Sequence, residues 1–230
     1  MELSSFLQAA RDGDLKRVTE LHQEGADINE TSKNGSSALI YAAEGGHLDV
    51  VKYLIEQGAD PEIQTKMGAT ALNRAAENGD IKMMKYLLEN GTPIGDLALI
   101  VAAREGNLEA VELLVENGAN VNAQQRWGHT ALMLAAREGH SSVVKLLIDS
   151  GANVRLKDKN GDSALNIALD NDNPDIVMQL RRAGAKAQIK KSSPVAAAED
   201  DDEDDDDSAD VDDLISDDDI PEDVDLDEDI

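Results

Sequence analysis

Along most of the chain, apolar residues recur at helical spacing in short segments that end at glycine. One segment places Leu39, Ala42 and Ala43 on one face of a helix, and the next places Val51 and Leu54 on one face of a second helix. A glycine separates the two segments, and another glycine follows the second, where a left-handed residue commonly ends a helix. Helices of about nine residues are too short to be stable alone, so neighbouring segments must supply the burial.

This two-helix unit is repeated six times. Ala-Ala pairs fall at steps of 33, 33, 27 and 33 residues, and a sixth unit continues the step. The pairs are Ala9-Ala10, Ala42-Ala43, Ala75-Ala76, Ala102-Ala103 and Ala135-Ala136, followed by Ala168-Leu169. In four units a Ser or Thr stands where it can cap the first helix, namely Ser37, Thr70, Thr130 and Ser163.

The repeated residues resemble the ankyrin repeat family, most closely in "GHLDVVKYLIEQGADPE" and "NGANVNAQQRWGHTALMLAAREGHSSVVKLLIDSGANV". The resemblance implies an all-α solenoid of stacked helix-turn-helix units with β-hairpin fingers between repeats and a concave surface that binds proteins. We expect this domain at residues 1–190. Its repeats are expected at about 1–33, 34–66, 67–93, 94–126, 127–159 and 160–190. Polar residues on the outer faces of the first and last units predict a complete array.

The third repeat is shortened. Gly91 to Ala98 is six residues shorter than Gly58 to Ala71, and the deletion falls where a finger is expected. Two readings are open: a tolerated loop deletion, or a notch in the finger row that admits part of a partner. In this chain, other residues replace the Pro and the His of the family's Thr-Pro-Leu-His opening in every repeat. The resemblance implies that losing the His removes a side-chain hydrogen bond that the family makes between repeats.

Charge and chemistry point away from catalysis. The chain has no cysteine, its four histidines lack metal-ligand spacing, and no phosphate-binding glycine loop or nucleophile motif occurs. Residues 1–198 hold 27 acidic and 21 basic residues, a balance that does not favour direct nucleic-acid binding. We therefore predict no enzyme activity, cofactor or metal. The lack of a secretory leader or long apolar run predicts no membrane insertion and a location in the cytoplasm or, in a eukaryote, also in the nucleus. We also expect the chain to be a monomer.

A partner-binding surface is predicted along the first helices and the fingers. On a helical wheel, the face opposite the core carries Tyr41, Arg74, Arg104, Leu134 and Arg137, although the apolar members of this row also fit the core. The fingers are numbered here by their tips, at residues 31–35, 64–68, 124–128 and 157–161, and each tip contributes a cation. The third tip carries Arg126 and Trp127, the only tryptophan, which is the best predicted anchor because Trp and Arg are enriched in binding hot spots. The other reading, equally open from sequence, is that Trp127 packs on the adjacent finger.

Residues 191–198 are predicted to be a linker and residues 199–230 a disordered tail, which holds 21 acidic residues and no basic one. Apolar residues are interleaved with the acids after the first run of acids. The tail is expected to solubilise the chain, to dock on a basic partner, or to associate with the basic fingers. We predict an adaptor or assembly chaperone that binds protein through fingers and groove, with the tail on a basic partner. The alternative is an inhibitor whose tail mimics nucleic acid or blocks the fingers.

Overall fold

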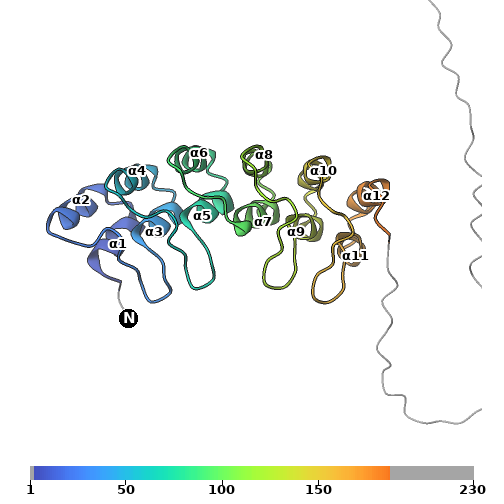
Figure 1. Cartoon of the computed structure of the whole chain (residues 1–230), viewed down its shortest axis with the longest axis horizontal. Helices are drawn as coiled ribbons and strands as arrows, with labels where there is room; N and C mark the ends of the chain where they lie inside the picture. The colour runs from blue at the N-terminus through green and yellow to red at the C-terminus, as the bar shows by residue number, and fades with distance from the viewer. Residues whose placement is uncertain (1–2, 187–230) are drawn as a thin grey trace, which may run out of the picture. The chain divides into compact units, whose positions relative to one another are not determined.

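The computed structural model describes residues 3–186, which form twelve α-helices arranged as six antiparallel pairs in a stack (Figure 1). In chain order the helices are α1 (Ser5–Asp12), α2 (Leu15–Gln23), α3 (Ala38–Glu44), α4 (Leu48–Glu56), α5 (Ala71–Asn78), α6 (Ile81–Glu89), α7 (Asp96–Glu105), α8 (Leu108–Glu116), α9 (Ala131–Glu138), α10 (Ser141–Asp149), α11 (Ala164–Asp170) and α12 (Pro174–Arg182). The predicted all-α repeat fold is confirmed. The predictions for the linker and acidic tail lie outside the described residues.

The expected caps begin the first helices. Ser37 Oγ accepts the backbone N–H of Ile40 at 3.3 Å, and Thr70, Thr130 and Ser163 cap α5, α9 and α11 in the same way. The bond satisfies one of the N–H groups that an isolated first turn leaves without a partner. Helix α7 is different, because it begins after Gly95 without a side-chain cap and has Asp96 in its first turn.

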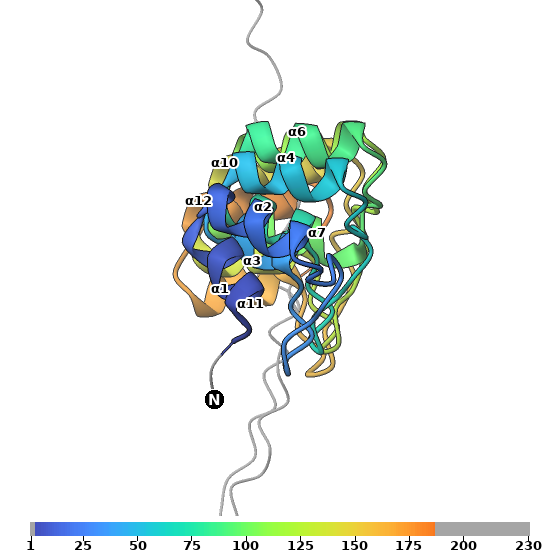
Figure 2. The ribbon, with the colours of Figure 1, turned by 90° about the vertical axis from the view of Figure 1, so that its left-hand side faces the viewer.

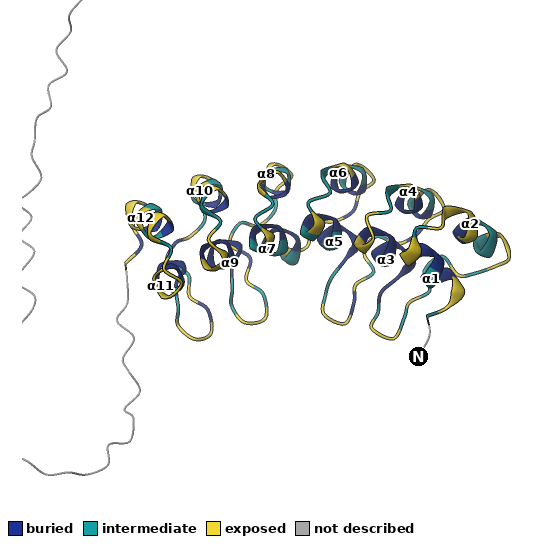
Figure 3. Cartoon of the chain, turned by 180° about the vertical axis from the view of Figure 1, so that it is seen from behind, coloured by how far each residue is buried: buried dark blue, intermediate teal, exposed yellow. Residues whose placement is uncertain are grey.

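The core lies between the helix pairs, as the dark blue surfaces in Figure 3 show. The odd-numbered helices form one layer, in which each packs against the next, and the even-numbered helices form a second layer (Figure 2). The paired alanines are almost fully buried at the contacts within the first layer. Because alanine is small, these backbones approach closely, and burial against both neighbours stabilises helices that could not form alone.

Polar side chains also join every pair of consecutive repeats. Asn107 Nδ2 donates to the carbonyls of Ala76 at 3.0 Å and Glu77 at 2.8 Å, and these carbonyls lie near the C-terminal end of α5. Equivalent bonds reach the preceding first helix at the other four interfaces, from His47, Asn78, His140 and Asn173. They satisfy carbonyls that a helix end leaves unpaired. The repeats thus keep side-chain hydrogen bonds between them although the family's opening His is missing.

The fingers are tight loops rather than β-hairpins with regular strands. In the third finger, Gln125 N–H donates to the His129 carbonyl at 3.1 Å and Gly128 N–H donates back to Gln125 at 2.7 Å. Among the described residues, the only β-bridges are isolated ones, Thr31 with Ser37 and Lys157 with Ser163. The expected β-hairpin fingers are thus present only as short antiparallel turns, and no strand ladder forms in the described residues.

Candidate protein-binding groove

The finger row is interrupted in the middle of the array. Only residues 90–95 connect α6 to α7, and no finger projects there, so two fingers lie on each side of a gap below α7 (Figure 1). The shortened repeat was predicted to lack this finger. Helix α7 starts two residues earlier, relative to its Ala-Ala pair, than α5 or α9 does.

The fingers on each side of the gap are tied together in pairs. Lys66 N–H donates to the Asn34 carbonyl at 2.8 Å, which joins the second finger to the first. Lys159 N–H donates to the Trp127 carbonyl at 3.0 Å, and Gln124 Nε2 donates to the Lys157 carbonyl at 3.0 Å, which joins the third finger to the fourth. Among residues 3–186, no backbone hydrogen bond joins the second finger to the third. The two finger pairs therefore form the sides of the gap.

A cavity of about 480 Å³ occupies this gap, and we call it the notch groove. The second and third fingers form its walls, and α5 and α7 form its floor. Its lining consists of Met67, Ala69, Asn73, Arg74, Glu77, Leu97, Val101, Arg104, Gln125, Arg126 and Trp127.

The walls carry two exposed apolar side chains. Met67 is 78% exposed and Trp127 is 65% exposed, and both line the notch groove. They occupy the same position of their finger tips, the fourth of five residues. In the first and fourth fingers, which are farther from the gap, that position holds Asn34 and Asn160. Large apolar side chains are costly to leave in water, so their restriction to the two tips beside the gap indicates a surface for contact.

The floor carries a chain of charged side chains across α5 and α7. Arg74 Nη1 binds Glu77 Oε2 at 2.7 Å, and Arg104 Nη2 binds the other oxygen, Oε1, also at 2.7 Å. Arg104 Nε reaches Glu105 Oε1 at 2.7 Å. The side-chain hydrogen bond to Glu105 raises the pKa of Arg104 and the charge of Glu77 adds to this effect, while burial opposes it. The Arg104 guanidinium is therefore a fixed positive charge in the floor.

Four of the seven predicted site residues line the notch groove: Arg74, Arg104, Arg126 and Trp127. Tyr41 and Leu134 were predicted on the exposed face of the first helices but are buried, at 9% and 3% exposed, and neither lines the notch groove. The Tyr41 hydroxyl donates to Ser32 Oγ at 3.2 Å and so supports the first finger. Leu134 has a finger on each side of its repeat and belongs to the core. Tyr41 lines a separate cavity of about 380 Å³ beside the first finger, so a contact with a partner there stays a prediction.

Arg137 is exposed but lies outside the notch groove, where its Nε binds Glu138 at 2.9 Å. Met67 and Leu97, which the sequence did not single out, also line the groove, as does Glu77 from the same helix face as Arg74. An alignment of the four finger tips holds the signal for Met67, since an apolar residue replaces Asn only in the two fingers that flank the deletion.

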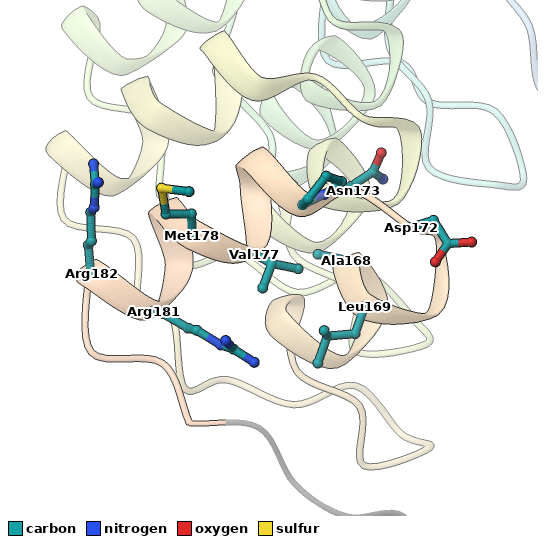
Figure 4. Close-up of a pocket in the computed structure, with 9 residues that line it drawn as sticks. Ala168, Leu169, Asp172, Asn173, Val177, Met178, Arg181 and Arg182 are labelled. Atoms are coloured by element: carbon teal, nitrogen blue, oxygen red, sulfur yellow. The ribbon is translucent and has the colours of Figure 1, made fainter. Parts of the chain in front are cut away.

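A second cavity, of about 650 Å³, lies on α11 and α12 (Figure 4). Leu169, Val177, Met178 and Arg181 are among its lining residues. In the preceding repeat, the residue equivalent to Val177 is Val144, which is buried under α12. This cavity is thus the stacking face of the sixth repeat, and its apolar character follows from the stacking geometry.

The histidines serve structural contacts. His47 Nε2 and His140 Nε2 donate to backbone carbonyls of the preceding repeat, at 3.0 Å and 2.9 Å. His22 Nδ1 lies 2.9 Å from the Tyr53 hydroxyl, and His129 Nε2 lies 3.2 Å from Asp158 Oδ2 on the next finger. In residues 3–186, no three His, Asp or Glu side chains are grouped to hold a metal ion. None of the helices described has the length and apolar character needed to cross a membrane.

Comparison with known proteins identifies the family. The family model described as "Ankyrin repeats (3 copies)" matches residues 6–98 and again residues 99–191, so the chain belongs to the ankyrin repeat family. A comparison with curated protein sequences gives no match. Ankyrin repeats are protein–protein interaction modules and are generally non-catalytic.

Solved structures agree with this assignment. The human ASB11 ankyrin repeat domain is 28% identical, with a TM-score of 0.72 over 83% of this chain and 88% of that one. An ankyrin repeat domain from Acinetobacter baumannii AYE is 30% identical, with a TM-score of 0.68 over 79% and 98%. A chain in the complex of the Bd0816 predatory endopeptidase from Bdellovibrio bacteriovorus with immunity protein Bd3460 is 31% identical, with a TM-score of 0.69 over 79% and 99%.

Proposed function

We propose that this chain is a non-catalytic adaptor or assembly chaperone that binds a protein partner in the notch groove. The observation that carries the proposal is the pair of exposed apolar side chains, Met67 and Trp127, on the two fingers that flank the missing one. An exposed tryptophan beside arginines has the composition of a binding hot spot. In this proposal the chain acts as a monomer in the cytoplasm, or in the nucleus of a eukaryote.

Two further observations support the proposal. The third finger is fastened to the fourth through the Trp127 carbonyl, so the Trp127 side chain stands on a rigid backbone and loses little conformational freedom on binding. A similar solved chain comes from an endopeptidase–immunity protein complex, which is an assembly between two proteins. A shared fold does not determine which ligand is bound, so this neighbour supports binding to a protein but does not identify the partner.

A binding comparison of the full-length chain with Trp127→Ala tests the proposal. Proteins captured from the native host by the wild-type chain are identified, and their affinity for the two forms is measured. We expect a loss of about ten-fold or more in affinity, with a change in unfolding free energy within about 0.5 kcal/mol because the side chain is exposed.

Met178→Ala is the matched control, because Met178 is also an exposed apolar residue, at 51%, but lies on α12 outside the notch groove. It should leave the affinity unchanged. Equal affinity for wild-type and Trp127→Ala would remove Trp127 from the interface, and the same result with Met67→Ala would reject the notch groove as the binding surface.

The role of the acidic tail is also a proposal, since residues 199–230 lie outside the described range. We propose that the tail engages a basic surface of the partner, and the alternative is an inhibitor whose tail mimics nucleic acid or blocks the basic fingers. Truncation after residue 195 separates them, and it leaves all six helix pairs of the described residues in place. Weaker binding supports a docking tail, stronger binding supports autoinhibition, and unchanged binding leaves only a solubilising role.

A further inference from the structure

The floor of the notch groove has one hydrogen-bond donor without an acceptor. Arg74 Nε is buried and has no hydrogen-bond partner among the residues that the structure describes. The nearest carboxylate oxygen paired with it, Glu44 Oε2, is 3.9 Å away, which is too long for a hydrogen bond. A guanidinium has five N–H donors, and a buried donor without an acceptor costs about 1–3 kcal/mol. Because Nε itself is buried while the Arg74 side chain is 30% exposed, a ligand meets the exposed part of this side chain, and Nε gains an acceptor only if the guanidinium turns.

The acceptors in the floor are already used. Each carboxylate oxygen of Glu77 binds one arginine at 2.7 Å, and no other acidic side chain lines the notch groove. The lining holds three arginines, at positions 74, 104 and 126, against this one glutamate. Glu105 and Glu44 lie beside the lining and neutralise part of the charge of Arg104 and Arg74, whereas Arg126 has no ion-pair partner among the described residues. Arg126 attracts a negatively charged group to one place on the surface.

The walls require an apolar group in the same ligand. Met67 and Trp127 stand on opposite fingers, and Leu97 and Val101 lie between them on α7. An aliphatic or aromatic side chain placed between these residues removes apolar surface from water on both partners. The groove is thus built for a ligand that is apolar at one point and acidic beside it.

We propose that the notch groove binds an acidic–apolar segment of a partner protein, in which an apolar side chain enters between Met67 and Trp127 and a neighbouring carboxylate accepts from Arg126, beside the partly exposed Arg74. The proposal rests on the proposed function and names the chemistry of the partner. A nucleic acid is disfavoured, because residues 1–198 carry 27 acidic against 21 basic residues and repel a polyanion. A single carboxylate is attracted by the arginines next to it. The acidic residues elsewhere on the chain repel it little, because salt screens charges at that distance.

Trp127 supplies a site-specific readout, because it is the only tryptophan in the chain. Peptides are selected from a random displayed library on the full-length protein, and individual peptides are then titrated while the emission of Trp127 is recorded. We expect peptides that shift this emission to contain an aromatic or aliphatic residue beside Asp or Glu. Basic peptides that bind other parts of this acidic chain should leave the emission unchanged, and so should an oligothymidylate.

Three variants test the contacts. Arg126→Gln should weaken binding of the selected peptide about ten-fold, as expected for a lost charge-assisted hydrogen bond. Lys33→Gln is the matched control. Lys33 occupies the same position in the first finger tip as Arg126 does in the third, and it is also exposed, but it lies outside the groove. It should leave the affinity unchanged. Arg74→Lys keeps the charge but removes the planar guanidinium, and it should weaken binding several-fold.

The outcomes separate this proposal from the proposed function. If emission-shifting peptides are basic or uncharged, or if Arg126→Gln and Lys33→Gln bind them equally, the acidic–apolar ligand is rejected, while a protein partner that depends on Trp127 keeps the proposed function. An emission shift with the oligothymidylate also overturns the peptide ligand. If captured proteins bind independently of both Trp127 and Met67, the proposed function itself fails.

Discussion

The backbone N–H of Lys159 donates to the backbone carbonyl of Trp127 at 3.0 Å, so the fourth finger holds the tip of the third from one side. The other side of the third finger faces the gap and has no finger next to it. The Trp127 side chain therefore stands on a supported backbone while most of its surface remains in water. This one-sided support makes the third finger a firm wall of the notch groove.

Close packing of the third and fourth fingers depends on Gly128. Its φ is +81°, and a Cβ at this position would lie 3.0 Å from Asp158 Cα. Gly128→Ala should lower the free energy of unfolding by about 2 kcal/mol, from backbone strain and contact with the next finger. Gly161→Ala has a similar φ of +86° but meets no atom within 4 Å, so it should cost only about 1 kcal/mol. Equal losses in chemical denaturation would show that the fingers do not restrict Gly128.

Asn107 is expected to stabilise the interface between the third and fourth repeats. Asn107→Ala removes both bonds to the end of α5, and we expect a loss of about 2 kcal/mol in unfolding free energy. Asn117 lies at the other end of α8 and donates to Leu113 of its own helix, in an exposed position. Asn117→Ala should therefore cost less than about 0.5 kcal/mol. If Asn117→Ala lowered the unfolding free energy as much as Asn107→Ala does, the loss would come from any asparagine at a helix end and not from the bonds between repeats.

Two buried threonines should respond in opposite ways to replacement by valine. Thr92 Oγ1, in the link that replaces the missing finger, is buried and has no hydrogen-bond partner among the described residues. Thr92→Val should raise the free energy of unfolding by about 1 kcal/mol, because the unsatisfied hydroxyl is removed at nearly constant volume.

Thr70 is the control for this substitution. Its hydroxyl oxygen accepts the Asn73 N–H at 3.3 Å and caps α5, so Thr70→Val should lower the unfolding free energy by about 1 kcal/mol. Thermal and urea unfolding of the two variants beside the wild type gives both signs in one experiment. Destabilisation by Thr92→Val would mean that its hydroxyl has an acceptor, for example a bound water.

Glu77→Gln should change ligand affinity more than stability. The pair of contacts to Arg74 and Arg104 is partly exposed, so its loss should cost less than about 1 kcal/mol of unfolding free energy. The substitution also removes the only acidic side chain of the groove lining and frees both arginines. Affinity for an acidic–apolar peptide should then rise several-fold in a Trp127 emission titration. A fall in affinity would show that Glu77 positions the arginines for the ligand and that its negative charge does not oppose binding.

Local rules made most of the fold predictable from sequence. Ser and Thr before Ala-Leu mark helix starts, glycine marks helix ends, and the step of the Ala-Ala pairs locates the shortened repeat. These signals act within a few residues, so no tertiary information is needed to read them. The cap of α7 could not be read in this way, because Gly95 offers no side chain there.

The groove was only partly predictable, because burial depends on what lies on both sides of each helix. Val101 and Leu134 occupy equivalent positions, yet Leu134 is buried among the fingers whereas Val101 is half-buried and lines the groove. A helical wheel treats the two alike. Met67 was missed for a related reason, since its importance appears only when the second and third fingers are recognised as neighbours across the gap.

The six-residue deletion in the third repeat also suggests how such a site can arise. No helix is lost, each repeat keeps its packing and its polar bond to the previous one, and the surface that becomes accessible consists of side chains already present on α5, α7 and the adjacent fingers. Shortening one loop therefore creates a concave site without building any new element. Its place along the stack is set by which repeat is shortened, so moving the deletion would move the gap, and the site's chemistry would change because other finger tips carry Asn34 and Asn160 in place of Met67 and Trp127.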